Sequence, residues 1–144
     1  MKIFIPDENF VWVLAGIVSN NGDGSFDVEV LDPEYLQLRF PQKKVVYLKD
    51  LPPLYTSFPL QNVDVKSDGA ADMCSLNYLH EPSILDNLFR RFRNELPYTN
   101  TGDISIAVNP YQWLPIYTDD LREEHIKHFR HELIPHVYAT SSGN

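Results

Sequence analysis

Apolar and polar positions follow a strand-like pattern through the first part of the chain. The run FVWVLAGIV (10–18) is dense in β-branched and aromatic residues, and SFDVEVLD (25–32) alternates apolar with acidic positions. NNGDG (20–24) predicts the turn between them, because Asn and Gly tolerate positive φ, and KKVVYLKDL (43–51) predicts another strand running into a turn. Short strands joined by tight turns predict a small β-barrel over residues 1–52, too small to enclose a deep ligand pocket.

The pattern changes after this β-rich part. Prolines and a Ser-Asp-Gly turn interrupt any lasting periodicity in residues 53–71, which predicts an ordered linker lying across the surface. We expect the second part of the chain, residues 72–144, to begin there.

A helix is predicted within HEPSILDNLFRRFRNELPY (80–98), because Pro82 suits a first helical turn and Pro97 ends the pattern. Its apolar residues recur at helical spacing and predict one buried stripe: Ile84, Leu85, Leu88, Phe89 and Phe92. The arginines fall outside this stripe, which is typical of a solvated face, with a binding patch as the alternative: Arg90, Arg91 and Arg93.

A strand is predicted within TGDISIAVNP (101–110). Its apolar positions share one face and its small residues the other, so we expect burial on both sides inside a mixed or parallel sheet. Pro110 ends the strand because it has no N–H to donate. NPYQWLPIY (109–117) therefore leaves the end of a core strand, where open α/β sheets bind ligands.

Two prolines, Pro110 and Pro115, prevent the segment 109–117 from forming a regular helix or strand. The same loop carries an amide and several rings: Asn109, Tyr111, Trp113 and Tyr117. This composition is typical of a loop that holds a flat ligand, and the alternative is a tight connector packed by its own rings.

A second helix is predicted within YTDDLREEHIKHFRHE (117–132), with Asp119 and Asp120 in the first turn, where carboxylates favour the helix dipole. Its predicted apolar face consists of Leu121, His125, Ile126 and Phe129. Pro135 predicts the first turn of a third helix.

Composition narrows the classes of function. A net charge of −8 and an isoelectric point near 4.9 argue against a nucleic-acid partner. The single cysteine, Cys74, indicates a reducing compartment and is expected to be buried and structural. No order of basic then apolar residues predicts a secretory signal, and the run at 10–18 is too short to span a membrane, so a cytosolic protein without membrane insertion is expected.

Motifs for catalysis and metal binding are absent or incomplete. His131, Glu132 and His136 approach H-E-x-x-H, but the spacing is wrong by one residue and Pro135 interrupts the helix, so no metal site is predicted. His125, His128 and His131 are three apart and do not share one face. The sequence contains no G-x-S-x-G and no G-x-x-x-x-G-K-[ST], so no catalytic residue is assigned.

NPYQWLPIY resembles the purine-binding loop of the myosin motor domain, whose general form is N-P-[YF]-x-x-[LI]-x-[IL]-Y. The flanking segments agree: residues 73–92 resemble the motor's early helix, 97–111 the strand leading into the loop, and 117–141 the next helix and the approach to the phosphate loop. The N-terminal 52 residues resemble, less strongly, the Src-homology-3-like barrel at the start of many myosin motors. The resemblance implies an α+β fragment: this small barrel, then the first helices and a core strand of a P-loop NTPase motor domain.

The resemblance also implies site residues. In the family, the loop's asparagine and closing tyrosine contact adenine, and these correspond to Asn109 and Tyr117. Pro110, Tyr111 and Trp113 complete the expected adenine-binding set for ATP. Trp113 departs from the family, which often has a basic residue near the ribose. An amide pairs with the polar edge of adenine, and a phenol stacks or donates to it.

The implied whole protein is an unconventional myosin heavy chain, an ATP-driven, actin-based motor of the cytoplasm and cytoskeleton. Its cofactor is ATP with Mg²⁺, whose ligands are not in this chain. Its partners are the actin filament and light chains, through parts absent here, and the remainder of the motor domain. Without the phosphate loop and switches, the piece is expected to be inactive and poorly soluble alone. The alternative is a stand-alone, non-enzymatic interaction module that docks through the barrel.

Overall fold

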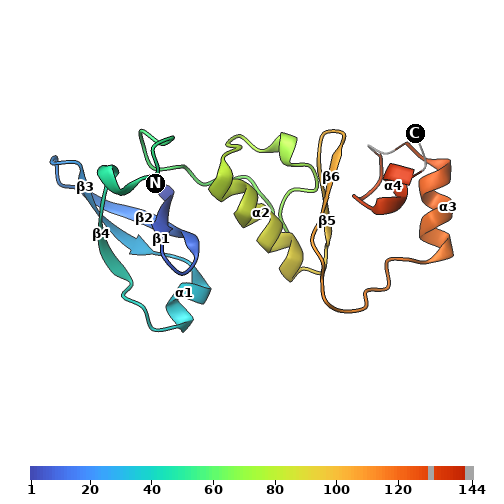
Figure 1. The fold of residues 1–144 in the computed structure, drawn as a ribbon, viewed down its shortest axis with the longest axis horizontal. Helices are drawn as coiled ribbons and strands as arrows, with labels where there is room; N and C mark the ends of the chain where they lie inside the picture. The colour runs from blue at the N-terminus through green and yellow to red at the C-terminus, as the bar shows by residue number, and fades with distance from the viewer. Residues whose placement is uncertain (130–131, 142–144) are drawn as a thin grey trace. The chain divides into compact units, whose positions relative to one another are not determined.

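The computed structural model describes residues 1–129 and 132–141, and the chain forms two compact units, 1–61 and 62–144 (Figure 1). Each unit has its own secondary structure and is described separately.

The N-terminal unit is built on an antiparallel sheet with the order β1-β2-β3-β4. Its strands are β1 (Lys2–Asp7), β2 (Val11–Asn20), β3 (Ser25–Val30) and β4 (Lys43–Tyr47); α1 (Pro33–Gln37) and the 3-10 turn η1 (Leu48–Asp50) flank β4. The predicted strands within 10–18, 25–32 and 43–51 are thus confirmed. The turn at 20–24 is confirmed as well, with Gly22 and Gly24 at positive φ.

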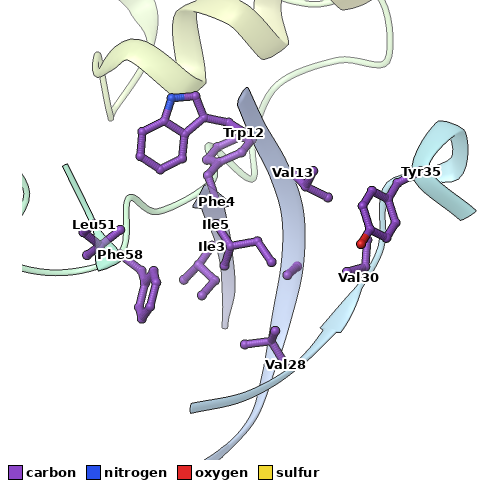
Figure 2. Close-up of a cluster of buried hydrophobic side chains, with 11 residues drawn as sticks. Ile3, Phe4, Ile5, Trp12, Val13, Val28, Val30, Tyr35, Leu51 and Phe58 are labelled. Carbon is purple, nitrogen blue, oxygen red and sulfur yellow. The ribbon is translucent and has the colours of Figure 1, made fainter. Parts of the chain in front are cut away.

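The core of this unit gathers side chains from β1, β2 and β3 and from segments that flank the sheet. Its buried members include Ile3, Phe4, Ile5, Trp12, Val13, Ala15, Val28, Val30, Tyr35, Leu51 and Phe58 (Figure 2). The alternation in β3 explains why the sequence was informative here, since Val28 and Val30 are buried while Asp27 and Glu29 between and beside them are only half-buried. A sheet with one covered face imposes this period of two.

Two features of the N-terminal unit differ from the sequence-based expectation. The strands form an open sheet rather than a closed barrel, and the outer edge of β1 is partly covered by the segment 59–61. Phe4 N donates to Pro59 O at 2.8 Å, and Gln61 N donates to Lys2 O at 3.1 Å. Strand β1 and helix α1 had not been assigned from the pattern, although Asp32 before Pro33 is a recognisable helix start.

The segment expected as a linker, 53–71, is shared between the two units. Residues 53–61 belong to the N-terminal unit, where Phe58 is part of the core, and residues 62–71 belong to the second unit.

The second unit contains α2 (Glu81–Arg93) beside a hairpin of β5 (Tyr98–Thr101) and β6 (Ile104–Ala107) (Figure 1). The 3-10 turn η2 (Met73–Ser75) precedes them, and α3 (Asp119–Lys127) and α4 (Val137–Ser141) follow. Helix α2 begins as predicted, with Pro82 in its first turn and the His80 side chain accepting from Ser83 N.

The prediction of which face of α2 is buried was wrong. Leu85, Phe89 and Phe92 of the expected core stripe are exposed, whereas Ser83, Asn87 and Arg91 are buried. Arg91, expected on a solvated face, is only 5% exposed. The reason is chemical, because this side of the helix meets backbone donors and acceptors, which require polar partners.

The strand predicted within 101–110 exists as β6, but it is not buried on both sides. Among the described residues it pairs, antiparallel, with β5 alone, and Ile104 is 66% exposed. The hairpin turn at Gly102, which has φ of +59°, had not been recognised in the sequence.

Helices α3 and α4 match their predictions in part. Asp119 and Asp120 occupy the first turn of α3, and Thr118 caps it by accepting from Leu121 N. On its expected apolar face, His125 is buried but Ile126 and Phe129 are exposed. Pro135 lies before α4 rather than in its first turn.

Candidate functional site

The segment 109–117 runs from the end of the β5–β6 hairpin to the start of α3 without regular structure, as predicted. Val108 N donates to Pro97 O at 2.9 Å, which closes the base of the hairpin just before the loop. Tyr111 has φ of +52°, a conformation that non-glycine residues rarely adopt. The Asn109 side chain supports this turn, because its Oδ1 accepts from Tyr111 N at 2.9 Å.

The two central rings of the loop face solvent. Tyr111 is 90% exposed and Trp113 is 97% exposed, while Leu114 beside them is only 8% exposed. Leu114 therefore anchors the loop and leaves the two rings available to a ligand. In the alternative, a connector packed by its own rings, Tyr111 and Trp113 would be buried, and both are exposed.

The amide of Asn109 is held in one orientation. Since Oδ1 accepts from a backbone N–H, the Nδ2 group points away from that contact, and it has no partner among the described residues. An exposed side-chain NH2 beside two exposed rings is able to donate to an acceptor on a flat, polar ligand.

Tyr117, the last residue of the loop, is tied to the hairpin. Its hydroxyl oxygen lies 2.6 Å from that of Tyr98 on β5. Burial, followed by the hydrogen bond with Tyr117, raises the pKa of Tyr98 to about 12. Tyr117 itself is 51% exposed, so part of its ring remains accessible.

Behind Tyr117 lies a cluster of rings from four segments: Tyr98, Tyr117, His125, His136 and Tyr138. His136 is at its centre, with ring centroids 4.4 Å from Tyr138, 5.0 Å from Tyr98 and 5.3 Å from both Tyr117 and His125. In the sequence His136 belongs only to an incomplete metal-binding motif, and no motif includes Tyr98.

His136 is 1% exposed and makes two hydrogen bonds. Its Nε2 lies 2.7 Å from Ile116 O, and its Nδ1 accepts from Tyr138 N at 3.1 Å. Burial, opposed by the bond to Ile116, and the neighbouring His125 lower the pKa of His136 below its ordinary value. A neutral imidazole therefore joins the loop to the start of α4.

Buried polar side chains of α2 hold the hairpin that carries Tyr98. Arg91 donates through Nε to Thr99 Oγ1 at 2.9 Å and through Nη2 to Tyr98 O at 2.8 Å. Asn87 pairs with both backbone groups of Ala70, at 2.7 and 3.0 Å. These contacts position β5, and through it the hydroxyl that meets Tyr117.

A cavity of about 430 Å³ lies on the inner side of this site. Its lining includes Ile116 and His136 behind the loop, Tyr98 of the hairpin, and the charged residues Asp64, Lys66, Asp68, Arg91 and Glu95. The exposed rings of Tyr111 and Trp113 are not part of its lining, so the loop has an inner face toward the cavity and an outer face toward solvent.

The remaining candidates are placed as follows. Cys74 is exposed rather than buried, and desolvation together with Asp72 raises its pKa, which lowers the fraction of thiolate at neutral pH. Residues 1–129 and 132–141 contain no cluster of three metal-ligating side chains, and His131 of the incomplete H-E-x-x-H lies outside the described residues. None of the described helices is long and apolar enough to cross a membrane.

Comparison with known proteins shows which family the chain belongs to. The family model described as "Myosin head (motor domain)" matches residues 70–143. Unconventional myosin-Va of Gallus gallus is 34% identical over 142 residues, which is 97% of this chain and 7% of that protein. The non-muscle myosin heavy chain of Drosophila melanogaster is 36% identical over 142 residues, 98% of this chain and 6% of that protein. Myosin-16 of Arabidopsis thaliana is 45% identical over 80 residues, 55% of this chain and 6% of that protein.

The chain thus spans only 6–7% of the length of these relatives. The similarity to myosin-Va and to the non-muscle heavy chain extends over almost the whole chain, including the open sheet of the first unit. The resemblance to the beginning of a myosin motor is confirmed: the chain belongs to the myosin heavy-chain family, and residues 70–143 belong to its motor domain.

Proposed function

We propose that residues 109–117 bind the adenine of ATP within an actin-based, ATP-driven myosin motor. The residues assigned to the base are Asn109, Pro110, Tyr111, Trp113 and Tyr117. The phosphates and Mg²⁺ would be held by parts of the motor outside this chain, because no phosphate-loop sequence occurs in it. This chain would contribute base recognition rather than the chemical step.

The observation that carries the proposal is the hydrogen bond that orients the side-chain amide of Asn109. Its carboxamide is fixed by the Tyr111 N–H, so the NH2 group is presented outward without a search through rotamers. Adenine offers ring nitrogens as acceptors, and an oriented donor costs less entropy on binding than a mobile one. Tyr111 and Trp113 supply exposed rings on the same short loop.

Tyr117 remains able to contribute although it is bonded to Tyr98. Two phenols hold two hydroxyl protons, and only one of them lies between the oxygens 2.6 Å apart. When Tyr98 is the donor of this bond, the hydroxyl proton of Tyr117 stays available to a ligand. Pro110 limits the backbone freedom of the loop beside Asn109, which favours a preformed site.

The first unit, residues 1–61, is proposed to be the Src-homology-3-like module of the heavy chain, and the second unit the start of a P-loop NTPase fold. The whole protein would act in the cytoplasm on the actin cytoskeleton, with the rest of the motor domain, actin and light chains as partners. The relatives' names support a myosin heavy chain, and the proposed partners follow from that family.

The experiment uses the intact motor that contains this segment. Asn109→Ala is expected to weaken the binding of ATP about tenfold, which is the effect of losing one well-placed hydrogen bond. The affinity for inorganic triphosphate is expected to stay the same. Gln112→Ala is the matched control, since Gln112 lies in the same loop and its side chain contacts Glu95 instead. Equal losses for ATP and triphosphate would remove the role given to Asn109.

The 144-residue chain alone is expected to show neither ATPase activity nor binding of a fluorescent ADP. Most of the affinity of such nucleotides comes from their phosphates, and this chain lacks a phosphate-loop sequence. Binding above background would contradict the assignment of the phosphate contacts to other parts of the motor.

A further inference from the structure

We propose that His136 is a positioning residue for the adenine-binding loop: one neutral tautomer ties Ile116 to the start of α4 and holds Tyr117 in place, and protonation breaks the link to α4. The inference rests on the proposed function of the loop for its effect on nucleotide affinity. The two hydrogen bonds of His136, to Ile116 and from Tyr138, are called the clamp. The clamp is a property of this chain and is tested separately.

The two hydrogen bonds of His136 admit one protonation state. Tyr138 N is a backbone donor, so Nδ1 must accept and carries no proton. Ile116 O is an acceptor, so Nε2 must donate and carries the single proton of the ring. A ring with both nitrogens protonated would direct an N–H at the N–H of Tyr138.

The bond to Ile116 acts directly on the site. Ile116 is the residue before Tyr117, and its carbonyl is fixed by a side chain twenty positions later in the sequence. The same imidazole packs edge-on against the Tyr117 ring, with 66° between the planes. His136 therefore contacts both the backbone and the ring at the closing end of the loop, while Asn109 supports the backbone at its beginning.

The surroundings of His136 disfavour a second proton. The titratable groups that face it are Tyr98 from β5, Tyr117 from the loop, His125 from α3 and Tyr138 from α4, and the charged residues of the shared cavity are Asp64, Lys66, Asp68, Arg91 and Glu95. None of the carboxylates forms a described ion pair with His136. Burial and His125 lower the pKa of the ring, so the clamp is formed at neutral pH.

Acid pH weakens the hydrogen bonding of His136. In the folded chain the pKa of His136 is below 6.5, so the unfolded or released ring binds a proton first as the pH falls. The stabilisation from the clamp is complete above that range and is lost as the pH falls through the folded-state pKa. The bond from Nε2 to Ile116 O survives protonation, because an imidazolium still donates there, so the contact that is lost is the one from Tyr138 N. We expect the start of α4 to loosen from the loop and adenine binding to weaken about twofold in the same interval.

The first test uses the 144-residue chain without nucleotide. Long-range nitrogen–proton NMR correlations of the imidazoles are expected to place the His136 proton on Nε2 at pH 7.5. Amide exchange of Tyr138 N–H is expected to accelerate as His136 is protonated. A proton on Nδ1 at pH 7.5, or a Tyr138 amide indifferent to the titration, would overturn the clamp.

The second test separates the two hydrogen bonds with a matched pair of variants in the intact motor. His136→Gln retains a donor that reaches toward Ile116 O but has no group that titrates near neutrality. His136→Asn retains an acceptor for Tyr138 N, because an asparagine side-chain oxygen commonly accepts from the backbone N–H two residues later. The asparagine side chain is too short to reach Ile116 O. Thermal unfolding of both variants establishes that they are folded.

At pH 7.5, His136→Gln is expected to bind ATP about twofold more weakly than the unchanged motor, because it lacks the acceptor for Tyr138 N, and His136→Asn about fivefold more weakly. Below about pH 6.5 the unchanged motor is expected to lose affinity for ATP relative to triphosphate, and His136→Gln to show a flat profile. Unchanged affinity in His136→Asn, or the same acid profile in His136→Gln, would refute the positioning role. If NMR supports the clamp while Asn109→Ala affects ATP and triphosphate equally, the proposed function fails and the clamp stands.

Discussion

The hydroxyl oxygens of Tyr98 and Tyr117 lie 2.6 Å apart, joining the β5 strand to the last residue of the 109–117 loop. The backbone carbonyl of Tyr98 is held by Arg91 of α2, and the ring of Tyr117 packs on His136. The loop is therefore stabilised at its closing end by residues from several segments, while its central rings remain open to solvent.

The first prediction concerns alkaline pH. The pKa of Tyr98 is raised to about 12, above the ordinary value of 10.0, so the unfolded chain loses this proton first. The stabilisation is complete below pH 10 and is lost as the pH rises toward about 12. Ultraviolet titration of phenolate is expected to show one late-ionising tyrosine that is absent in Tyr98→Phe. Its persistence in Tyr98→Phe, or its disappearance in the control Tyr111→Phe, would contradict this assignment.

The second prediction concerns the buried amide of α2. Asn87→Asp is expected to destabilise the second unit by about 2–4 kcal/mol, because a carboxylate oxygen would replace the donor that faces Ala70 O. Asp86→Asn, the neighbouring control, removes the partly exposed ion pair with Arg90 and is expected to cost less than about 1 kcal/mol. Urea unfolding of each variant measures both, and equal costs would contradict a specific role for Asn87.

These polar contacts explain why the sequence predicted α2 but not its buried face. Periodicity locates a helix, since Pro82 and the spacing of apolar residues identify it without any tertiary information. The choice of face assumes that the apolar side is the covered one. In this chain Ala70 and the backbone of β5 lie against the other side, so Asn87 and Arg91 are buried instead. By contrast, β3 has one covered face in a sheet, and its alternation predicted burial correctly.

The candidate site also has features that the sequence predicts and features that only the tertiary fold shows. The irregular loop and its exposed rings follow from local sequence, because Pro110 and Pro115 exclude regular structure. Tyr98 and His136 are brought to Tyr117 by the tertiary fold, from positions 19 residues before and 19 residues after it. No periodicity relates such positions, so their part in the site required the structure.

The third prediction tests the exposed stripe of α2. Phe89 is 44% exposed, so Phe89→Gln is expected to change the free energy of unfolding of this chain by less than about 1 kcal/mol and to raise its solubility. Met73, which is 1% exposed in the same unit, is the control, and Met73→Gln is expected to cost at least about 2 kcal/mol. Denaturant unfolding and the saturation concentration are the measurements. A cost for Phe89→Gln as large as that of Met73→Gln would show that the stripe is covered.

The last prediction concerns Gly69, which packs on the buried side of α2. Its φ is +83°, and a Cβ there would lie 2.8 Å from Asn87 Oδ1, 3.0 Å from Arg91 Cγ and 3.2 Å from the Asn87 backbone oxygen. Gly69→Ala therefore adds both backbone strain and a clash that the helix backbone cannot relieve, and we expect a loss of about 2–4 kcal/mol in the second unit.

Gly102→Ala is the matched control in the same unit. Its φ is also positive, at +59°, but the nearest atom to a new Cβ is Cys74 Sγ at an ordinary 3.7 Å. Only the conformational strain of about 1 kcal/mol is then expected. Because Gly69 contacts the two side chains that hold Ala70 and β5, its substitution is also expected to accelerate amide exchange in the β5–β6 hairpin. If both alanine variants unfold at the same denaturant concentration, the close packing at Gly69 does not contribute to the position of the loop.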